Sequence, residues 1–305
     1  MKTIMKEKTR NKSFEPLFDI GGRFTPFVYL APSFLVTVVF LIYPFINTFF
    51  YSLCAWDGFG KKKFIGLENY INLIQDLKFW SSFNANIIYI LMYSLIPTIL
   101  GLIIASLIGR TDLKGVRIYR TIFFMPQVIA SVAVGIIFSW IYSPQFGVLN
   151  QILGWLGLDS LKRAWLGNEV TAPIAIGLIG VWLTVGFAVI IFIAGIQKTE
   201  ESIYEAADLD GANSVRVFFN ITLPELRYEI VVVIIVTLIR SLSTNIFGIV
   251  SSTTGGAYNT RPISLYAYQL SFVQYNMGYA STVVVILVAI ILLLSRLIKA
   301  IGERG

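Results

Sequence analysis

The sequence predicts an all-α polytopic membrane protein with six transmembrane helices. Only 13% of its 305 residues are charged and 56% are hydrophobic, whereas a typical soluble domain is about 25% charged and about 45–50% apolar. So few charges cannot cover a water-soluble surface of this size. The apolar residues also gather into six long windows, five free of charge and one interrupted by Arg240. Each window is long enough for the roughly 20 residues that a helix needs to cross a bilayer.

Each apolar window supplies one predicted span. The spans cover residues 27–52, 83–109, 118–142, 171–196, 229–250 and 278–300. The first is too long for a secretory signal, contains Pro32 and Pro44, and lacks a small-residue cleavage site, so we expect it to be retained. Between the third and fourth spans, residues 146–158 are apolar with few polar interruptions. They predict either a short helix in the outer interface or a plain re-entrant connection.

Lysine and arginine set the predicted orientation, because they concentrate on the cytoplasmic side of membrane proteins. With both termini inside, 16 of these residues fall on cytoplasmic segments and seven on external ones, although Lys61–Lys63 lie outside. We therefore predict a basic cytoplasmic tail at 1–26, a six-helix transmembrane domain at 27–300 and a cytoplasmic C-terminus at 301–305. The one substantial cytoplasmic loop is then 197–228.

Missing residue types narrow the chemistry. The chain has no histidine and one cysteine, Cys54, which excludes histidine general bases, histidine metal sites and an internal disulfide. Its basic residues flank the apolar runs instead of forming a nucleic-acid patch. The sequence therefore predicts no catalytic residue, no metal site and no nucleic-acid partner.

The cytoplasmic loop reads as two short capped helices. Thr199 is a candidate N-cap for the first, and Gly211 suits the left-handed residue that ends it. Asn213 or Ser214 can cap the second helix, and Pro224 is expected to stop it.

The faces of these two helices predict a docking surface. Ile203, Ala206 and Ala207 share one face of the first helix, where small side chains permit close approach. Its carboxylates, Glu205 and Asp208, point elsewhere and can pair with arginine on another protein. On the second helix, Val215, Phe218 and Phe219 form an apolar patch. The alternative is a solvated connector between two spans.

These residues carry a resemblance to a known family. Glu205-Ala206-Ala207, Asp210-Gly211-Ala212, Phe218, Ile221 and Leu223-Pro224 match, at the family's spacing, the EAA loop of ATP-binding-cassette (ABC) importer permeases. The flanking motifs resemble the carbohydrate-importer branch, which includes the larger maltose permease and the glycerol-phosphate permeases. Among them are Gly66-Leu67-Glu68-Asn69-Tyr70, Phe123-Phe124-Met125-Pro126 and Thr254-Gly255-Gly256.

The resemblance implies a type I ABC importer permease fold in a bacterial or archaeal cytoplasmic membrane. The implied partners are a second homologous permease, two cytoplasmic ATPase subunits, an extracytoplasmic solute-binding protein, a sugar substrate and membrane lipid. No cofactor is implied for this chain, since ATP and Mg²⁺ would bind the ATPase; the sequence also lacks a G-x-x-x-x-G-K-[ST] phosphate loop. The coupling helix that docks on the ATPase would involve Glu205, Ala206, Ala207, Asp210, Gly211, Ala212, Phe218 and Pro224.

The same resemblance implies a substrate pathway on the fourth and fifth spans. The positions that match sugar contacts are Gly180, Thr184, Phe187, Ser241, Leu242 and Asn245. The chain departs from the maltose-type permease notably at Ser241 and Leu242, so a different sugar, or no stable site in this subunit, is a further possibility. Ser, Thr and Asn also serve as packing groups between membrane helices. Arg240 has three readings: snorkelling, pairing with an acidic partner, or binding an anionic substrate.

Two other functional classes compete with an importer subunit. A stand-alone secondary transporter or channel for a small polar solute needs intramembrane carboxylates for ion coupling, and the interiors of the predicted spans carry none. An intramembrane enzyme ranks last, because histidine and paired intramembrane carboxylates are both absent from the sequence.

Overall fold

The computed structural model describes residues 25–109 and 121–304. Most of the predicted basic tail (1–26), the start of the third predicted span with Arg120, and Gly305 lie outside the described residues. The chain divides into two compact units, residues 1–47 and residues 48–305. In the first unit and across its boundary, α1 (Thr25–Thr37), a π-helical turn η1 (Val38–Ile42) and α2 (Tyr43–Ser52) run continuously.

The described residues of the second unit are mainly helical, with one small hairpin in which β1 (Cys54–Ala55) pairs antiparallel with β2 (Lys63–Phe64). Its helices are α3 (Glu68–Ile74), α4 (Leu77–Ile90), η2 (Leu91–Leu95), α5 (Ile96–Ile108), η3 (Met125–Val128), α7 (Ser131–Ile141), α8 (Val148–Trp155), η4 (Asp159–Leu161), α9 (Thr171–Ile196), α10 (Glu201–Leu209), α11 (Ser214–Val217), η5 (Phe218–Thr222), α12 (Leu223–Glu225), α13 (Arg227–Leu242), α14 (Thr244–Thr253), α15 (Ile263–Phe272) and α16 (Met277–Arg304).

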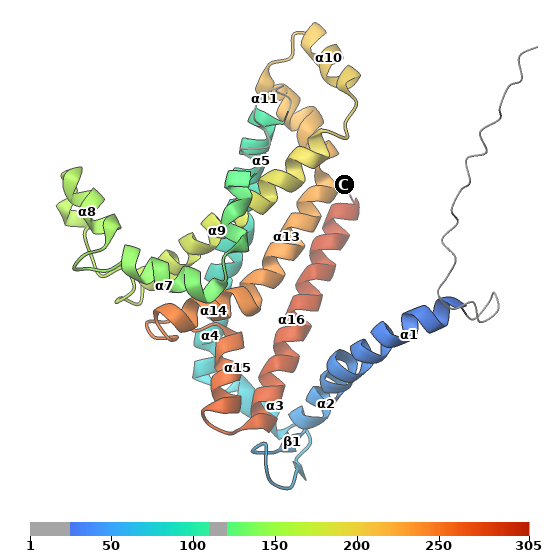
Figure 1. Ribbon diagram of the computed structural model, residues 1–305, viewed down its shortest axis with the longest axis vertical. Coiled ribbons are helices and arrows are strands. Elements are labelled where there is room, and N and C mark those ends of the chain that lie inside the picture. Colours follow the sequence, from blue (N-terminus) through green and yellow to red (C-terminus); the bar gives the residue numbers. More distant parts are fainter. Residues whose placement is uncertain (1–24, 110–120, 305) are drawn as a thin grey trace, which may run out of the picture. The chain divides into compact units, whose positions relative to one another are not determined.

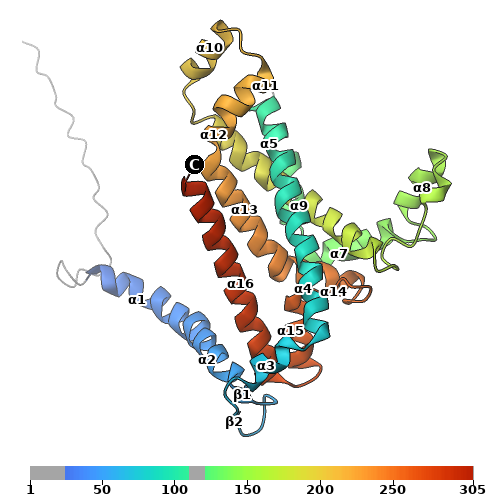
Figure 2. The same cartoon turned by 180° about the vertical axis from the view of Figure 1, so that it is seen from behind.

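Five helices among the described residues are long and apolar enough to cross a membrane. They are Phe27–Ser52, Leu77–Ile108, Thr171–Ile196, Arg227–Thr253 and Met277–Gly302. Within the second unit, the long helices α5, α9, α13 and α16 run side by side, with α10 and α11 at one end and α3 and α15 toward the other (Figures 1 and 2).

The third predicted span is not one continuous helix. The structure holds two helices there, Thr121–Val128 and Ser131–Ile141, bent by 102°. Pro126 has no N–H to continue a helical ladder, and Ile129 and Ala130 adopt extended backbone, with ψ of 132° and 135°. The pair counts as a sixth span if its two halves cross together. The fifth span is also interrupted, at Ser243 between α13 and α14 (φ −114°, ψ −140°).

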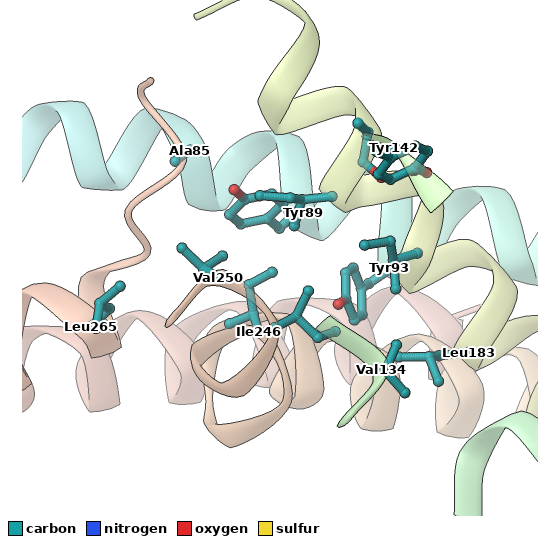
Figure 3. Packing of buried hydrophobic residues seen from close by; sticks show 13 residues of the cluster. Ala85, Tyr89, Tyr93, Val134, Tyr142, Leu183, Ile246, Val250 and Leu265 are labelled. Atoms are coloured by element: carbon teal, nitrogen blue, oxygen red, sulfur yellow. Dashed lines mark hydrogen bonds between the residues drawn. The ribbon is translucent and has the colours of Figure 1, made fainter. Parts of the chain in front are cut away.

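The main core cluster lies where α4, α7, α9, α14 and α15 meet (Figure 3). Tyr89 and Tyr93 are fully buried in it, and the Tyr89 hydroxyl donates to the Thr260 carbonyl at 2.7 Å. Small residues bring α7 and α14 together: a Cβ added at Gly135 would lie 1.9 Å from the Ser252 hydroxyl, and one at Gly248 would lie 2.1 Å from the Ser131 hydroxyl. These close contacts hold the second half of the bent pair against the fifth span.

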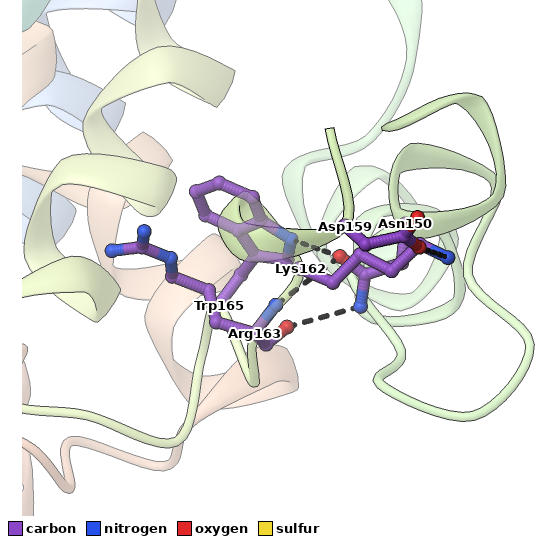
Figure 4. Close-up of polar contacts among 5 residues, drawn as sticks. All are labelled: Asn150, Asp159, Lys162, Arg163 and Trp165. Carbon is purple, nitrogen blue, oxygen red and sulfur yellow. Dashed lines mark hydrogen bonds and ion pairs between the residues drawn. The ribbon is translucent and has the colours of Figure 1, made fainter. Parts of the chain in front are cut away.

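The predicted interfacial segment forms the helix α8, and Asn150 fixes the chain that follows it (Figure 4). The Asn150 amide donates to the Arg163 carbonyl at 3.0 Å and accepts from the Trp165 indole N–H at 2.9 Å. Trp155 and Leu156 are exposed beside it. The segment thus holds a short helix with an exposed apolar edge, and its position in the outer interface stays a prediction.

The half-buried carboxylate of Asp76 joins three helices at the end of the second unit opposite α10. Asp76 caps α4 by accepting from the Lys78 backbone N–H at 2.8 Å. Its other oxygen accepts from the Tyr266 and Tyr279 hydroxyls at 2.5 and 2.6 Å. Burial raises the pKa of Asp76, but these hydrogen bonds outweigh it and hold the pKa below its usual value. The ionised carboxylate therefore stabilises the junction of α4, α15 and α16.

Asp76→Asn is expected to lower the thermal midpoint of the detergent-solubilised protein at pH 7. Hydrogen bonds to a charged group contribute about 1.5–3 kcal/mol, and we expect the lower end because Asp76 is only half-buried. Because the folded pKa is depressed, this stabilisation is present above a pH of about 4 and is lost as the pH falls through the folded value. Thermal scans from pH 7 to pH 3 should show wild type and variant converging; a constant difference would contradict the assignment.

Candidate functional site

The residues of the predicted coupling loop form a helix with a defined end. α10 ends at Leu209, and Gly211 follows in the left-handed region, with φ of 69°. The Gly211 N–H donates to the Asp208 carbonyl at 3.2 Å, and the Ala212 N–H donates to the Ala207 carbonyl at 3.0 Å. This pair of bonds is a Schellman motif, which a glycine at this position favours. The predicted role of Gly211 in ending the first helix is thus seen in the backbone.

Two details of the loop differ from the sequence prediction. Glu200, not Thr199, is the N-cap of α10, and no side chain caps it. Pro224 does not end the second helix at its own position: α11, η5 and α12 run on through Leu223–Glu225, so the helical run ends one residue after the proline. Asn213 does cap α11, because its side chain accepts from the Arg216 backbone N–H at 2.8 Å.

One buried side chain anchors α10, and its larger apolar side chains, Ile203 and Leu209, stay exposed. Tyr204 is buried, and its hydroxyl lies 3.5 Å from the Thr222 hydroxyl. Leu209 is 90% exposed and Val215 65% exposed. Glu205, Ala206, Asp208 and Asp210 are exposed too, whereas Ala207 and Ala212 are half-buried. The loop therefore presents apolar and acidic groups together on two short helices at one end of the unit (Figure 1).

Four of the six predicted pathway residues are buried inside the chain. Thr184 donates to the carbonyls of Tyr93 and Gly180, and Ser241 donates to the Leu238 carbonyl. A Cβ added at Gly180 would lie 1.9 Å from the Tyr93 ring. Leu242 packs into the cluster between α3, α4, α13, α15 and α16. Contacts within the chain thus occupy these four positions.

The remaining two predicted residues, Phe187 and Asn245, are half-exposed. The Phe187 ring lies beside the charged group of Arg240. The Arg240 guanidinium carbon lies 4.9 Å from the centre of the Phe187 ring. One Arg240 nitrogen, Nη1, donates to the Gln127 amide oxygen at 2.9 Å. Gln127 was not singled out from the sequence; the signal that marks it is a polar residue next to a proline inside an apolar run.

Comparisons with known proteins identify the family. A family model described as the inner membrane component of binding-protein-dependent transport systems matches residues 97–304. The chain belongs to this family. It is therefore a multi-pass membrane protein and a permease subunit of an ABC transporter, whose ATPase is a separate subunit.

The relatives cover nearly the whole chain. A probable ABC transporter permease of Bacillus subtilis is 34% identical over 278 residues, which are 90% of this chain and 94% of that one. The permease of a diacetylchitobiose uptake system of Streptomyces coelicolor is 31% identical, covering 90% and 81%. The fold is that of a chain in the crystal structure of a bacterial importer of the acidic polysaccharide alginate, with a TM-score of 0.78, 23% identity, and 92% and 95% coverage.

Proposed function

We propose that this chain forms half of the translocation pathway of an ATP-driven carbohydrate importer. A second homologous permease would supply the other half. The observation that carries the proposal is the α10–α11 pair: a helix ended by a Schellman motif, anchored by Tyr204, with exposed carboxylates and apolar side chains at its tip. An element so fixed and so exposed fits a surface that docks on another protein.

The fixed geometry suggests how ATP hydrolysis would drive the pathway. Glu205 and Asp210 would pair with basic groups of the ATPase, while Ala206 and Ala207 would allow its surface to approach the helix backbone. α11, η5 and α12 lead without a long loop into α13. A displacement of α10 by the ATPase would therefore reach the fifth span as a rigid-body movement.

The relatives support a carbohydrate substrate. The Streptomyces coelicolor relative is named for diacetylchitobiose uptake, and the fold neighbour imports alginate. A further solved structure with the same TM-score shows the alginate importer in complex with a periplasmic protein that holds an alginate pentasaccharide. By analogy, an extracytoplasmic solute-binding protein would deliver a sugar to this chain and its partner permease.

The test is to extract the chain gently from its native membrane, identify what copurifies, and reconstitute the complex with its binding protein. We expect a second six-span permease, two ATPase subunits, and ATP hydrolysis that a sugar-loaded binding protein stimulates at least several-fold. The chain recovered alone, with uptake insensitive to ATP depletion, would instead favour the stand-alone secondary transporter.

Asn245→Leu is expected to impair sugar uptake without loss of assembly. Asn245 is half-exposed near the break at Ser243, and leucine keeps the size of the side chain but removes two donors and an acceptor. Uptake measured against sugar concentration should show kcat/KM lowered about tenfold or more, the effect of losing one good polar contact. Unchanged kinetics would remove Asn245 from the pathway.

A further inference from the structure

Arg240 carries a permanent charge inside an apolar span. Residue 240 is midway along the apolar helix Arg227–Thr253. At 1.5 Å per residue, each end of that helix is about 20 Å away, farther than an arginine side chain extends. A permanent positive charge at this depth needs a counter-charge or a polar cavity.

The structure gives the guanidinium polar and aromatic neighbours but no negative one. Gln127 accepts one hydrogen bond from it, and Phe187 offers its ring face. Among the described residues we find no other hydrogen bond or ion pair to Arg240, so most of its five N–H donors stay available. The Gln127 amide nitrogen is itself buried without a partner. The remaining N–H groups of Arg240 and the side-chain NH₂ group of Gln127 therefore lie close together without an acceptor among the described residues.

Both polar residues stand beside breaks in their spans. Gln127 precedes the extended residues Ile129 and Ala130 at the 102° bend. Arg240 precedes the break at Ser243. Irregular backbone at membrane depth is tolerated where it lines a cavity or is covered by protein, and transporters place substrates at such interrupted helices near the bilayer midplane.

We infer that Gln127, Phe187 and Arg240 form a subsite for an anionic group of the imported sugar, such as the carboxylate of a uronate. This inference rests on the proposed function and narrows its substrate class. The guanidinium fork matches a carboxylate in two parallel hydrogen bonds, and Phe187 holds the fork in place by stacking on it. A neutral sugar would satisfy donors but leave the charge uncompensated.

The test uses the whole importer in proteoliposomes with its binding protein. The probes are labelled neutral disaccharides of glucose, galactose and N-acetylglucosamine. Each is compared with its uronate, the same disaccharide with a carboxylate in place of one hydroxymethyl group. We expect the wild type to import a uronate. Arg240→Met should lower kcat/KM for that uronate ten- to a hundredfold while changing uptake of the neutral sugars less than threefold. The exposed external residue Arg163 supplies the control, since Arg163→Met should leave both unchanged.

A second variant guards against loss of assembly. Gln127→Glu keeps the size of the side chain and supplies the missing negative charge, so it should assemble normally and lose uronate uptake. Retained uronate uptake in that variant overturns the inference. Equal losses of uptake for neutral sugars and uronates in Arg240→Met overturn it too. So does rescue of the assembly of Arg240→Met by removing a carboxylate of the second permease, because that carboxylate would then be the partner of Arg240. ATP-driven uptake of neutral sugars alone leaves the proposed function standing and removes the subsite; no uptake of any sugar removes both.

Discussion

Gly186→Ala is expected to reduce ATP-driven uptake at least tenfold and to destabilise the second unit. The Cβ of alanine would lie 1.7 Å from the carbonyl oxygen of Phe123 and 2.5 Å from its carbon. Because these are backbone atoms, no side-chain rotation relieves the clash. Overpacking of this kind costs about 1–3 kcal/mol and occasionally more, against a gain of about 1 kcal/mol from helix propensity.

The consequence reaches the site because Phe123 lies in the first half of the bent pair, four residues before Gln127. Moving that segment off α9 would separate Gln127 from Arg240. Thermal melting of the purified complex and uptake assays check the prediction, with Gly60→Ala as the matched substitution. At Gly60 the added Cβ meets only the Asp57 carboxylate, at 3.4 Å. If both glycine variants behaved like the wild type, the close approach at Gly186 would have no functional role.

Gly211→Val is expected to abolish coupling while the chain still inserts. The added Cβ meets nothing within 4 Å, so its effect comes from the positive φ alone. A left-handed conformation costs an L-residue about 1–2 kcal/mol, and for a β-branched side chain it is a genuine outlier. The turn would rearrange and change the direction in which α10 leaves α11, breaking the contact of Tyr204 with Thr222. Stimulated ATP hydrolysis and uptake should both fall at least tenfold.

Gly211→Asn supplies the control for conformation, because asparagine adopts the left-handed region with a smaller penalty. It should retain most of the coupled activity. Retained, substrate-stimulated hydrolysis in Gly211→Val, or equal loss in both variants, would show that the left-handed turn is not what couples the loop.

The features that local chemistry fixes were predictable from the sequence. Charge-free stretches of about 20 residues indicate membrane spans, because a helix of that length crosses the bilayer and pairs its own backbone polar groups in lipid. Gly211 indicates the end of α10 and Asn213 the start of α11. Both signals are readable because the glycine conformation and the asparagine hydrogen bond depend on neighbours within a few residues. The family assignment follows from such local motifs taken in order.

What the sequence left open depends on contacts between distant segments. Thr184 and Ser241 are polar residues in apolar helices, and nothing local tells whether such a group faces a pathway or bonds to its own helix. The bend after Gln127 was missed because Pro126 is compatible with a kinked helix as well as with a broken one. The pairing of Gln127 with Arg240 joins residues 113 positions apart, beyond the reach of any periodicity.

The most direct test of the account is whether α10 lies against the ATPase. Cys54 is the only cysteine of the chain and is buried, so Leu209→Cys in a Cys54→Ser background gives one reactive thiol on the tip of the loop. A photo-crosslinker attached there should form an adduct with the ATPase subunit, and assembly should protect the thiol from labelling. The same reagent on a Leu156→Cys variant, beside α8, should not reach the ATPase. If the thiol of the Leu209→Cys variant were labelled equally in the free chain and the complex and gave no ATPase adduct, the account of coupling would be contradicted.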